Sequence, residues 1–582
     1  MSLFRSSIRV SRLFSVVDVV VLAALGAIVY GLIAVGSEWS GELRPVVVID
    51  LSPWALPRYT LLSLFRGFAA YLLSLTFTLT YGRVAAYNRR AEKVMVPLLD
   101  ILQSIPVLGF LPGLVLALVA LFPHSNVGLE LSCVIMIFTG QAWNMTFSFY
   151  HSLRSIPPEL RDAANVYRLT SWQRFLQLEL PYSAVGLVWN SMMSMAGGWF
   201  FLTVCEAFVL RGKDFRLPGI GSYMSYAIEN DNVPAMIYGV VAMIAMIVAV
   251  DQLVWRPIVA WSQKFKLEET EASQQAGSTV LSFLQKSHLL RWVDTRLWTP
   301  LVTLAAPQPK LVEGEAVALP LVGLARREVR PPSIRKVLAW LVGVAALVGV
   351  GWGAVSVVRL LMHLRAGNWL RIGGLTGLTF LRVTAAVIIG TIWAVPAGVA
   401  IGLNPRLSRV FQPIIQILAS FPAPMIYPLV LLALHWAGVT INWGAIVLML
   451  LGTQWYVLFN VIAGAMAIPH DLREVTVVYR MGRWERWRRL VLPAIFPYLV
   501  TGWVTAAGGA WNASIVAEAV QFGGRTLTAD GLGATISLAT ADGRFALLAA
   551  CVLAMCVAVV GVNRVVWQPL YRVAEEKFSL TK

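Results

Sequence analysis

Charged residues are scarce in this chain, and their scarcity excludes most classes of protein. Of 582 residues, only 13% are Asp, Glu, Lys or Arg, whereas 58% are hydrophobic and the mean hydropathy is +0.70. Soluble domains carry about 25% charged and about 45–50% apolar residues. The composition therefore excludes a soluble enzyme, a disordered tail and a coiled coil, and it predicts an all-α polytopic membrane protein.

Residues that would carry catalysis or metal binding are equally rare. The four cysteines lie in apolar runs without a C-x-x-C pair, and the six histidines form no H-E-x-x-H motif. A G-x-x-x-x-G-K-[ST] loop is also absent, so the chain offers no Walker-type cradle for ATP phosphates. We therefore predict no metal site, no catalytic residue and no cofactor bound by this chain.

Acidic residues are outnumbered, with 30 against 47 basic ones and a net charge of +17. In a membrane protein such an excess collects in cytoplasmic loops beside anionic lipid. We therefore expect contact with membrane lipid and no binding of nucleic acid.

Apolar runs long enough to cross a bilayer occur about twelve times. The first follows Arg5, Arg9 and Arg12 but is too long for a cleaved signal peptide. The predicted spans are 16–37, 59–82, 94–121, 129–150, 180–210, 233–255, 337–361, 373–402, 410–434, 440–466, 491–520 and 545–563.

The distribution of basic residues predicts the orientation of these spans. With the N-terminus inside, 35 of the 47 Lys and Arg residues fall in inner segments and 9 in outer loops. Basic residues favour the cytoplasmic side. Both termini of this multi-pass protein are therefore predicted to be cytoplasmic.

The chain also repeats itself at an offset of 312 residues. The segment IPPELRDAANVYRLTSWQRFLQLELP (156–181, the first repeat loop) matches IPHDLREVTVVYRMGRWERWRRLVLP (468–493, the second repeat loop). The same offset pairs Trp199 with Trp511 and Glu206 with Glu518, and an offset of 316 pairs Pro112 with Pro428. We therefore predict two homologous halves of six helices each, running in parallel.

This organisation divides the chain into five parts. The predicted linker, at 261–336, contains a stretch that fits either an interfacial amphipathic helix or a flexible tether. The parts are 1–58 (N-terminal arm, first span and outer loop), 59–260 (first membrane domain), 261–336 (cytoplasmic linker), 337–372 (first helix and outer loop of the second half) and 373–582 (second membrane domain).

Both repeat loops resemble the EAA loop of type I ABC importer permeases. That pattern has E-A-A, a glycine four positions after the second alanine, an aromatic residue and a final Leu-Pro. Asp162-Ala163-Ala164 and Glu474 stand at its start, while Arg168 and Arg480 occupy the glycine position. The Pro-broken third core helix and the glycine-rich outer loops resemble the nitrate/sulfonate/taurine/bicarbonate permeases.

The resemblance implies a fused permease of a bacterial inner membrane, with both membrane domains of a binding-protein-dependent importer in one chain. Its partners would be two ATP-binding subunits, which hold ATP and Mg²⁺, and a periplasmic solute-binding protein that delivers a small anion. The residues expected to couple to the ATPases are Glu159, Arg161, Asp162, Ala163, Ala164, Tyr167, Arg168, Trp172, Asp471, Arg473, Glu474, Tyr479, Arg480, Gly482 and Trp484.

Prolines and polar residues within the spans predict a route for the solute between the two halves. Glu206 and Glu518 would shape a gate or, as we favour, pair with arginine, for example Glu206 with Arg211; Arg66 and Arg382 are expected to snorkel to the outer interface. The candidate pathway residues are Pro106, Pro112, Asn190, Trp199, Glu206, Pro422, Pro428, Trp511, Asn512 and Glu518.

An ATP-independent secondary transporter with two parallel repeats is the main alternative. The loop G-x-x-x-D-R-x-G-R-R, typical of the major facilitator class, does not follow the second span. A membrane enzyme is disfavoured by the lack of catalytic motifs, and the sequence alone does not name the solute.

Overall fold

The computed structural model describes residues 49–104, 107–210, 213–265, 351–362, 364–522 and 525–578, with the single residues 282 and 348. Within these ranges the chain is helical apart from short connections and two small hairpins. The predicted span at 16–37, most of the linker at 261–336 and the first part of the span at 337–361 lie outside the described residues.

The first half is a series of long helices joined by short turns. Its elements are η1 (Pro53–Ala55), α2 (Leu56–Tyr87), α3 (Arg89–Ser104), η2 (Val107–Phe110), α4 (Leu111–Leu121), α5 (Val127–Arg154), α6 (Pro158–Val166), α7 (Ser171–Arg174), η3 (Phe175–Glu179), α8 (Leu180–Glu206), β1 (Val209–Leu210), β2 (Lys213–Asp214), α9 (Ile220–Glu229), α10 (Val233–Val250), η4 (Asp251–Trp255), α11 (Arg256–Ser262) and η5 (Gln263–Phe265).

The second half follows the same order. Its elements are α16 (Ala366–Leu403), α17 (Pro405–Ser420), η7 (Ala423–Ile426), α18 (Tyr427–Trp436), α19 (Ile441–Met466), α20 (His470–Val478), α21 (Arg483–Arg486), η8 (Trp487–Val491), α22 (Leu492–Ala517), β3 (Ala519–Phe522), β4 (Arg525–Thr528), α23 (Leu532–Ala541), α24 (Phe545–Val562), η9 (Asn563–Trp567) and α25 (Gln568–Phe578).

Irregular turns recur at matched positions of the two halves. The π-helical turns η3 and η8 are 312 residues apart, as are η4 and η9, and the 3-10 turns η2 and η7 are 316 residues apart. Because π-helical turns are rare, the agreement of their positions shows that the sequence repeat is a repeat of backbone structure. The predicted fold of two homologous helical halves is confirmed.

Among the described residues, six helices are long and apolar enough to cross a membrane, and a bent pair raises the number to seven. That pair, α17 and η7–α18, bends by 81°, which confirms the proline-broken helix expected within the span at 410–434. Its counterpart at 94–121 is likewise divided into α3 and α4. Pro112 and Pro428 stand in the first turn of the second helix of each pair, where the missing N–H of proline leaves no helical hydrogen bond unmade.

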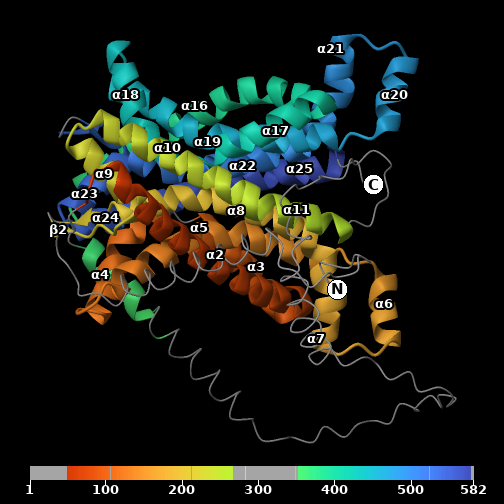
Figure 1. Cartoon of the computed structure of the whole chain (residues 1–582), viewed down its shortest axis with the longest axis horizontal. Coiled ribbons are helices and arrows are strands. Elements are labelled where there is room, and N and C mark those ends of the chain that lie inside the picture. Colours follow the sequence, from red (N-terminus) through yellow and green to blue (C-terminus); the bar gives the residue numbers. More distant parts are fainter. Residues whose placement is uncertain are drawn as a thin grey trace, which may run out of the picture.

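The two halves pack against each other through a shared hydrophobic core. One cluster of buried side chains includes Met136 and Trp199 from the first half and Tyr427 and Trp511 from the second. The helices α6 and α7 lie at the same end of the bundle as α20 and α21, while β2, α9 and α23 lie at the other end (Figure 1). The fold therefore places the repeat loops and the hairpins at opposite ends of the long helices.

Candidate functional site

The two repeat loops form matched projections at one end of the molecule (Figure 1). Each contains a helix of nine residues, α6 or α20, that follows directly on a spanning helix. Pro158 stands in the first turn of α6, where its missing N–H leaves no hydrogen bond unmade. A short second helix, α7 or α21, then leads through a π-helical turn into the next spanning helix.

Both nine-residue helices end in the same left-handed turn. Arg168 has φ of 49° and Arg480 has φ of 50°. The N–H of each arginine bonds a carbonyl three residues back, at 3.0 Å. A residue in the left-handed conformation commonly ends a helix, and it is usually glycine, because a Cβ costs about 1 kcal/mol in this region. Arginine at this point is therefore strained in both halves.

Apolar and aromatic side chains on these loops point away from the protein. Val478 and Tyr479 are 77% and 73% exposed, and their counterparts Val166 and Tyr167 are exposed as well. Exposed apolar clusters of this kind mark sites of interaction. The other predicted coupling residues that are exposed are Glu159, Asp162, Ala163, Arg168, Trp172, Asp471, Glu474, Arg480, Gly482 and Trp484.

Three predicted coupling residues face inward and anchor the loops instead. The Nη2 atom of Arg161 donates to the Leu153 carbonyl at 2.9 Å, and that of Arg473 donates to the Ala465 carbonyl at 2.9 Å. Ala164 is buried. Partial burial lowers the pKa of Arg473 from its usual value. These contacts fix each nine-residue helix to the end of the preceding spanning helix.

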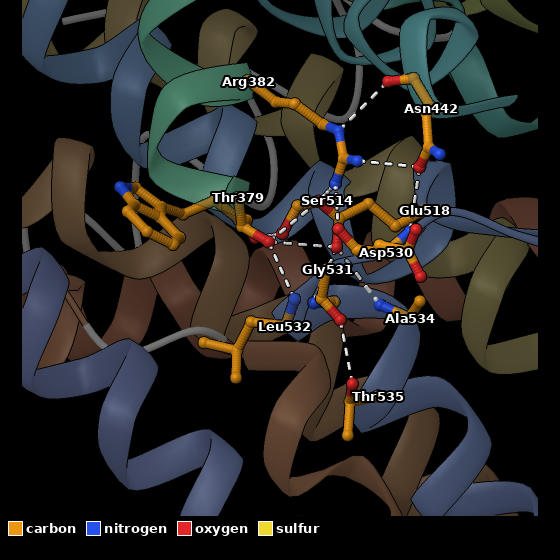
Figure 2. Close-up of polar contacts among 12 residues, drawn as sticks. Thr379, Arg382, Asn442, Ser514, Glu518, Asp530, Gly531, Leu532, Ala534 and Thr535 are labelled. Carbon is orange, nitrogen blue, oxygen red and sulfur yellow. Dashed lines mark hydrogen bonds and ion pairs between the residues drawn. The ribbon is translucent and has the colours of Figure 1, made fainter. Parts of the chain in front are cut away.

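Buried ion pairs lie at the opposite end of the spanning helices. In the second half, Nη1 of Arg382 donates to Oε1 of Glu518 at 2.9 Å and to the Asp530 carbonyl at 2.8 Å (Figure 2). The Nη2 atom of Arg382 also donates to Oδ1 of Asn442 at 2.9 Å. Thr379 donates to Glu518 at 2.8 Å, so the network joins α16, α19, α22 and the turn before α23.

The first half holds the same network with one more charge. Arg66 donates to Glu206 at 2.8 Å and, through two nitrogens, to Glu130 at 2.6 and 2.7 Å. Glu130 occupies the position of Asn442, and Ser63 that of Thr379. Sequence reasoning missed Glu130, although an acidic residue in the apolar run of α5 and its alignment with Asn442 were available as signals.

These contacts correct two expectations. Arg66 and Arg382 do not snorkel to the outer interface, because their side chains are only 1% and 9% exposed and are held by carboxylates. Glu206 is paired with arginine, as we favoured, but with Arg66 rather than Arg211, which lies outside the described residues.

Glycines let the carboxylates approach the backbone. Gly219 and Gly531 precede α9 and α23, and a Cβ on either would lie 2.4 Å or less from an oxygen of Glu206 or Glu518. N–H groups in the first turns of α9 and α23 donate to these carboxylates, from Gly221 at 2.8 Å and from Gly533 at 2.8 Å. Each glutamate thus caps the N-terminus of a helix while it holds an arginine.

A cavity of about 270 Å³ lies between the two halves, near the buried ion pairs. Three pairs of equivalent helices form most of its wall: α4 with α18, the end of α8 with the end of α22, and α9 with α23. Pro112 and Pro428 line it, as do the matched hydroxyl residues Ser225 and Ser537. No charged side chain is among the described residues that line it.

The other candidate pathway residues lie elsewhere. Glu206 and Glu518 are fully buried in their networks, and Trp199 and Trp511 are buried in the core between the halves. Asn512 accepts the Val107 N–H at 2.9 Å across the two halves, whereas Asn190 donates to the Gly186 carbonyl at 3.0 Å within its own helix. Pro422 is buried beside the break in the second half, and Pro106 lies outside the described residues.

Comparison with known sequences identifies one family in both halves. The pattern of the family described as "Binding-protein-dependent transport system inner membrane component" matches residues 78–254 and 386–568, more than half of the chain. Both repeat loops and the helices on either side of them fall within the matched ranges.

Several curated proteins are similar to part of the chain. The bicarbonate transport system permease protein CmpB of Synechococcus elongatus is 33% identical over 156 residues, which cover 27% of this chain and 52% of that protein. The nitrate import permease protein NrtB of Leptolyngbya laminosa is 28% identical over 142 residues, 24% of this chain and 50% of that protein. The putative aliphatic sulfonates transport permease protein SsuC of Bacillus subtilis is 25% identical over 145 residues, which cover 25% of this chain and 50% of that protein. The chain spans about half the length of these relatives.

Proposed function

Because the chain belongs to the family of binding-protein-dependent transport system inner membrane components, we propose that it supplies both membrane-spanning halves of one ATP-driven importer. As a permease of the ABC transporter class, it would rely on two separate ATP-binding subunits, identical or different, to hydrolyse ATP with Mg²⁺. A periplasmic binding protein would deliver the solute to the end of the molecule that carries the hairpins.

The observation that carries this proposal is the matched pair of repeat loops. Two projections at one end of the bundle present the same Val-Tyr-Arg sequence on the same exposed turn. Aromatic residues and arginine are the side chains most enriched in binding hot spots. A pair of equivalent surfaces suits a pair of equivalent partners, which favours one ATP-binding subunit under each loop.

The anchoring of the loops supports a mechanical coupling. Since Arg161 and Arg473 tie α6 and α20 to the spanning helices α5 and α19, a displacement of either loop would be transmitted to that half. Closure of the ATP-binding subunits would then move the two halves against each other as rigid bodies and change the side to which the pathway opens.

The cavity between the halves suits a passage more than a high-affinity site. Its described walls offer hydroxyl groups, such as those of Ser225 and Ser537, but no cation to hold an anion tightly. We propose that selection takes place on the binding protein and that the solute crosses this cavity with few hydrogen bonds. Bicarbonate, nitrate and sulfonates, the solutes named for similar permeases, are the first candidates.

A pull-down of the tagged chain in mild detergent tests the proposal. An ATP-hydrolysing subunit should co-purify with the wild type, and Arg168→Glu with Arg480→Glu should abolish its binding or its coupling to transport. Arg90→Glu with Arg406→Glu is the matched control, because these arginines are also exposed and equivalent but stand at the starts of α3 and α17. The control variant should retain the ATPase.

A secondary transporter would give the opposite result. The chain alone, in liposomes with a proton gradient, would then accumulate solute without ATP, and no ATP-hydrolysing protein would co-purify with it. That outcome would reject the importer proposal and the role given to the repeat loops.

A further inference from the structure

Arg168 and Arg480 hold a backbone conformation that suits glycine better than arginine. Their φ values of 49° and 50° fall in the left-handed region, where a side chain is disfavoured. The strain stands at the same point of both repeat loops, and Gly482 lies only two residues beyond the second arginine. The chain therefore keeps a strained residue twice where glycine would relieve the strain.

A second left-handed turn, at the other end of the molecule, has glycine in one half and a different residue in the other. Asp231 and Gly543 are 312 residues apart and have φ values of 49° and 65°. Here one half uses glycine and the other does not, so the two halves tolerate divergence at such a turn. At the repeat loops both halves carry arginine, which indicates that the guanidinium itself has a use. Strained residues that persist commonly mark functional sites.

The surroundings of the two arginines indicate what they contact. Both side chains are exposed. They belong to the turns that join α6 to α7 and α20 to α21, and these helices lie at one end of the bundle (Figure 1). The turns follow helices that begin beyond the ends of α5 and α19, so a protein partner that approaches this end of the bundle can reach them. A guanidinium binds a carboxylate through two parallel hydrogen bonds, and tyrosine and valine beside it add an apolar contact.

We propose that Arg168 and Arg480 each bind a carboxylate of an ATP-binding subunit, and that the left-handed turn aims the guanidinium at it. The inference rests on the proposed function and adds to it the residue and the chemistry of the contact. The fixed turn holds the arginine in place before binding, so less conformational freedom is lost when the partner docks.

The experiment measures binding of the purified ATP-binding subunit to the full chain in phosphatidylcholine nanodiscs, at 50 and 300 mM NaCl. Two double variants separate charge from backbone strain: Arg168→Asn with Arg480→Asn, and Arg168→Gly with Arg480→Gly. Both should weaken binding by about tenfold per arginine and reduce its salt dependence. Lysine at both positions should retain part of the affinity, since it keeps the charge but not the paired hydrogen bonds.

Thermal unfolding of the same variants distinguishes contact from structure. The glycine variant should melt at the wild-type temperature or above, although it binds more weakly. Asp231→Gly is the matched control, because it relieves the same strain at the opposite end and should leave binding unchanged.

The inference is overturned if the glycine or asparagine variant binds as tightly as the wild type, or if either loses thermal stability. Failure of the proposed function would look different, since the wild-type chain itself would then bind no ATP-binding subunit.

Discussion

Arg66 illustrates how a membrane protein keeps a buried charge, because acceptors surround its guanidinium. Its guanidinium contacts two carboxylates and the Pro218 carbonyl, and its side chain is 1% exposed. Two carboxylates beside one arginine would leave a negative charge, but the N-terminus of α9 adds a positive dipole beside Glu206. In the second half Asn442 replaces the extra carboxylate, so the same arrangement holds with a different balance of charge.

Removal of either arginine should therefore be far more harmful than removal of the extra carboxylate. We predict that Arg66→Ala lowers the free energy of unfolding by about 3–5 kcal/mol, because it leaves buried carboxylates unpaired. Glu130→Asn should lower the free energy of unfolding by less, because Asn442 already accepts a hydrogen bond from Arg382 at the equivalent position. Chemical unfolding in detergent, followed by tryptophan fluorescence, measures both. Equal losses for the two variants would contradict this account of the network.

At the scale of elements, α9 and α23 are attached to the spanning helices through their first turns. Gly219 and Gly531 allow this attachment, since any side chain there would collide with a buried carboxylate. The hairpins are fixed by the same glutamates, whose carbonyls accept the Leu217 N–H at 3.0 Å and the Ala529 N–H at 2.8 Å. One residue at the end of each long helix thus orders a hairpin and a helix.

Substitution of these glycines should dislodge the attached element. We predict that Gly531→Ala lowers the free energy of unfolding by about 1–3 kcal/mol, because its Cβ would lie 2.1 Å from Oε2 of Glu518. Gly508→Ala in α22 is the control, since nothing lies within 4 Å of its Cβ and alanine favours a helix by roughly 0.5–1 kcal/mol. Melting temperatures in detergent should therefore move in opposite directions. If the melting temperature falls for both variants, α22 tolerates no added methyl group. The loss for Gly531→Ala could then not be assigned to its close approach to Glu518.

At the scale of the whole molecule, the sequence predicted the two homologous halves but missed contacts between residues that are far apart in the chain. Matched residues such as Trp199 and Trp511 revealed two halves, and Pro112 and Pro428 marked the broken helices. The partner of Arg66 could not be read in the same way, because Glu130 and Glu206 lie 64 and 140 residues away and depend on how the helices pack. The left-handed turns were signalled indirectly, since Arg168 and Arg480 stand where the resembling loops have glycine.

The charge distribution predicts the orientation of the molecule in the membrane, and cysteine labelling at two exposed positions tests this prediction. Asn165 on α6 and Asn230 after α9 are exposed and lie at opposite ends of the bundle. We predict that a membrane-impermeant maleimide labels Asn230→Cys in right-side-out vesicles and Asn165→Cys only in inverted ones. The native cysteines give little background, because Cys133, Cys205 and Cys551 are buried and Cys556 is partly buried. The reverse pattern would place the repeat loops outside the cell, beyond the reach of any ATP-binding subunit, and labelling of both from one side would contradict the passage of α8 across the membrane.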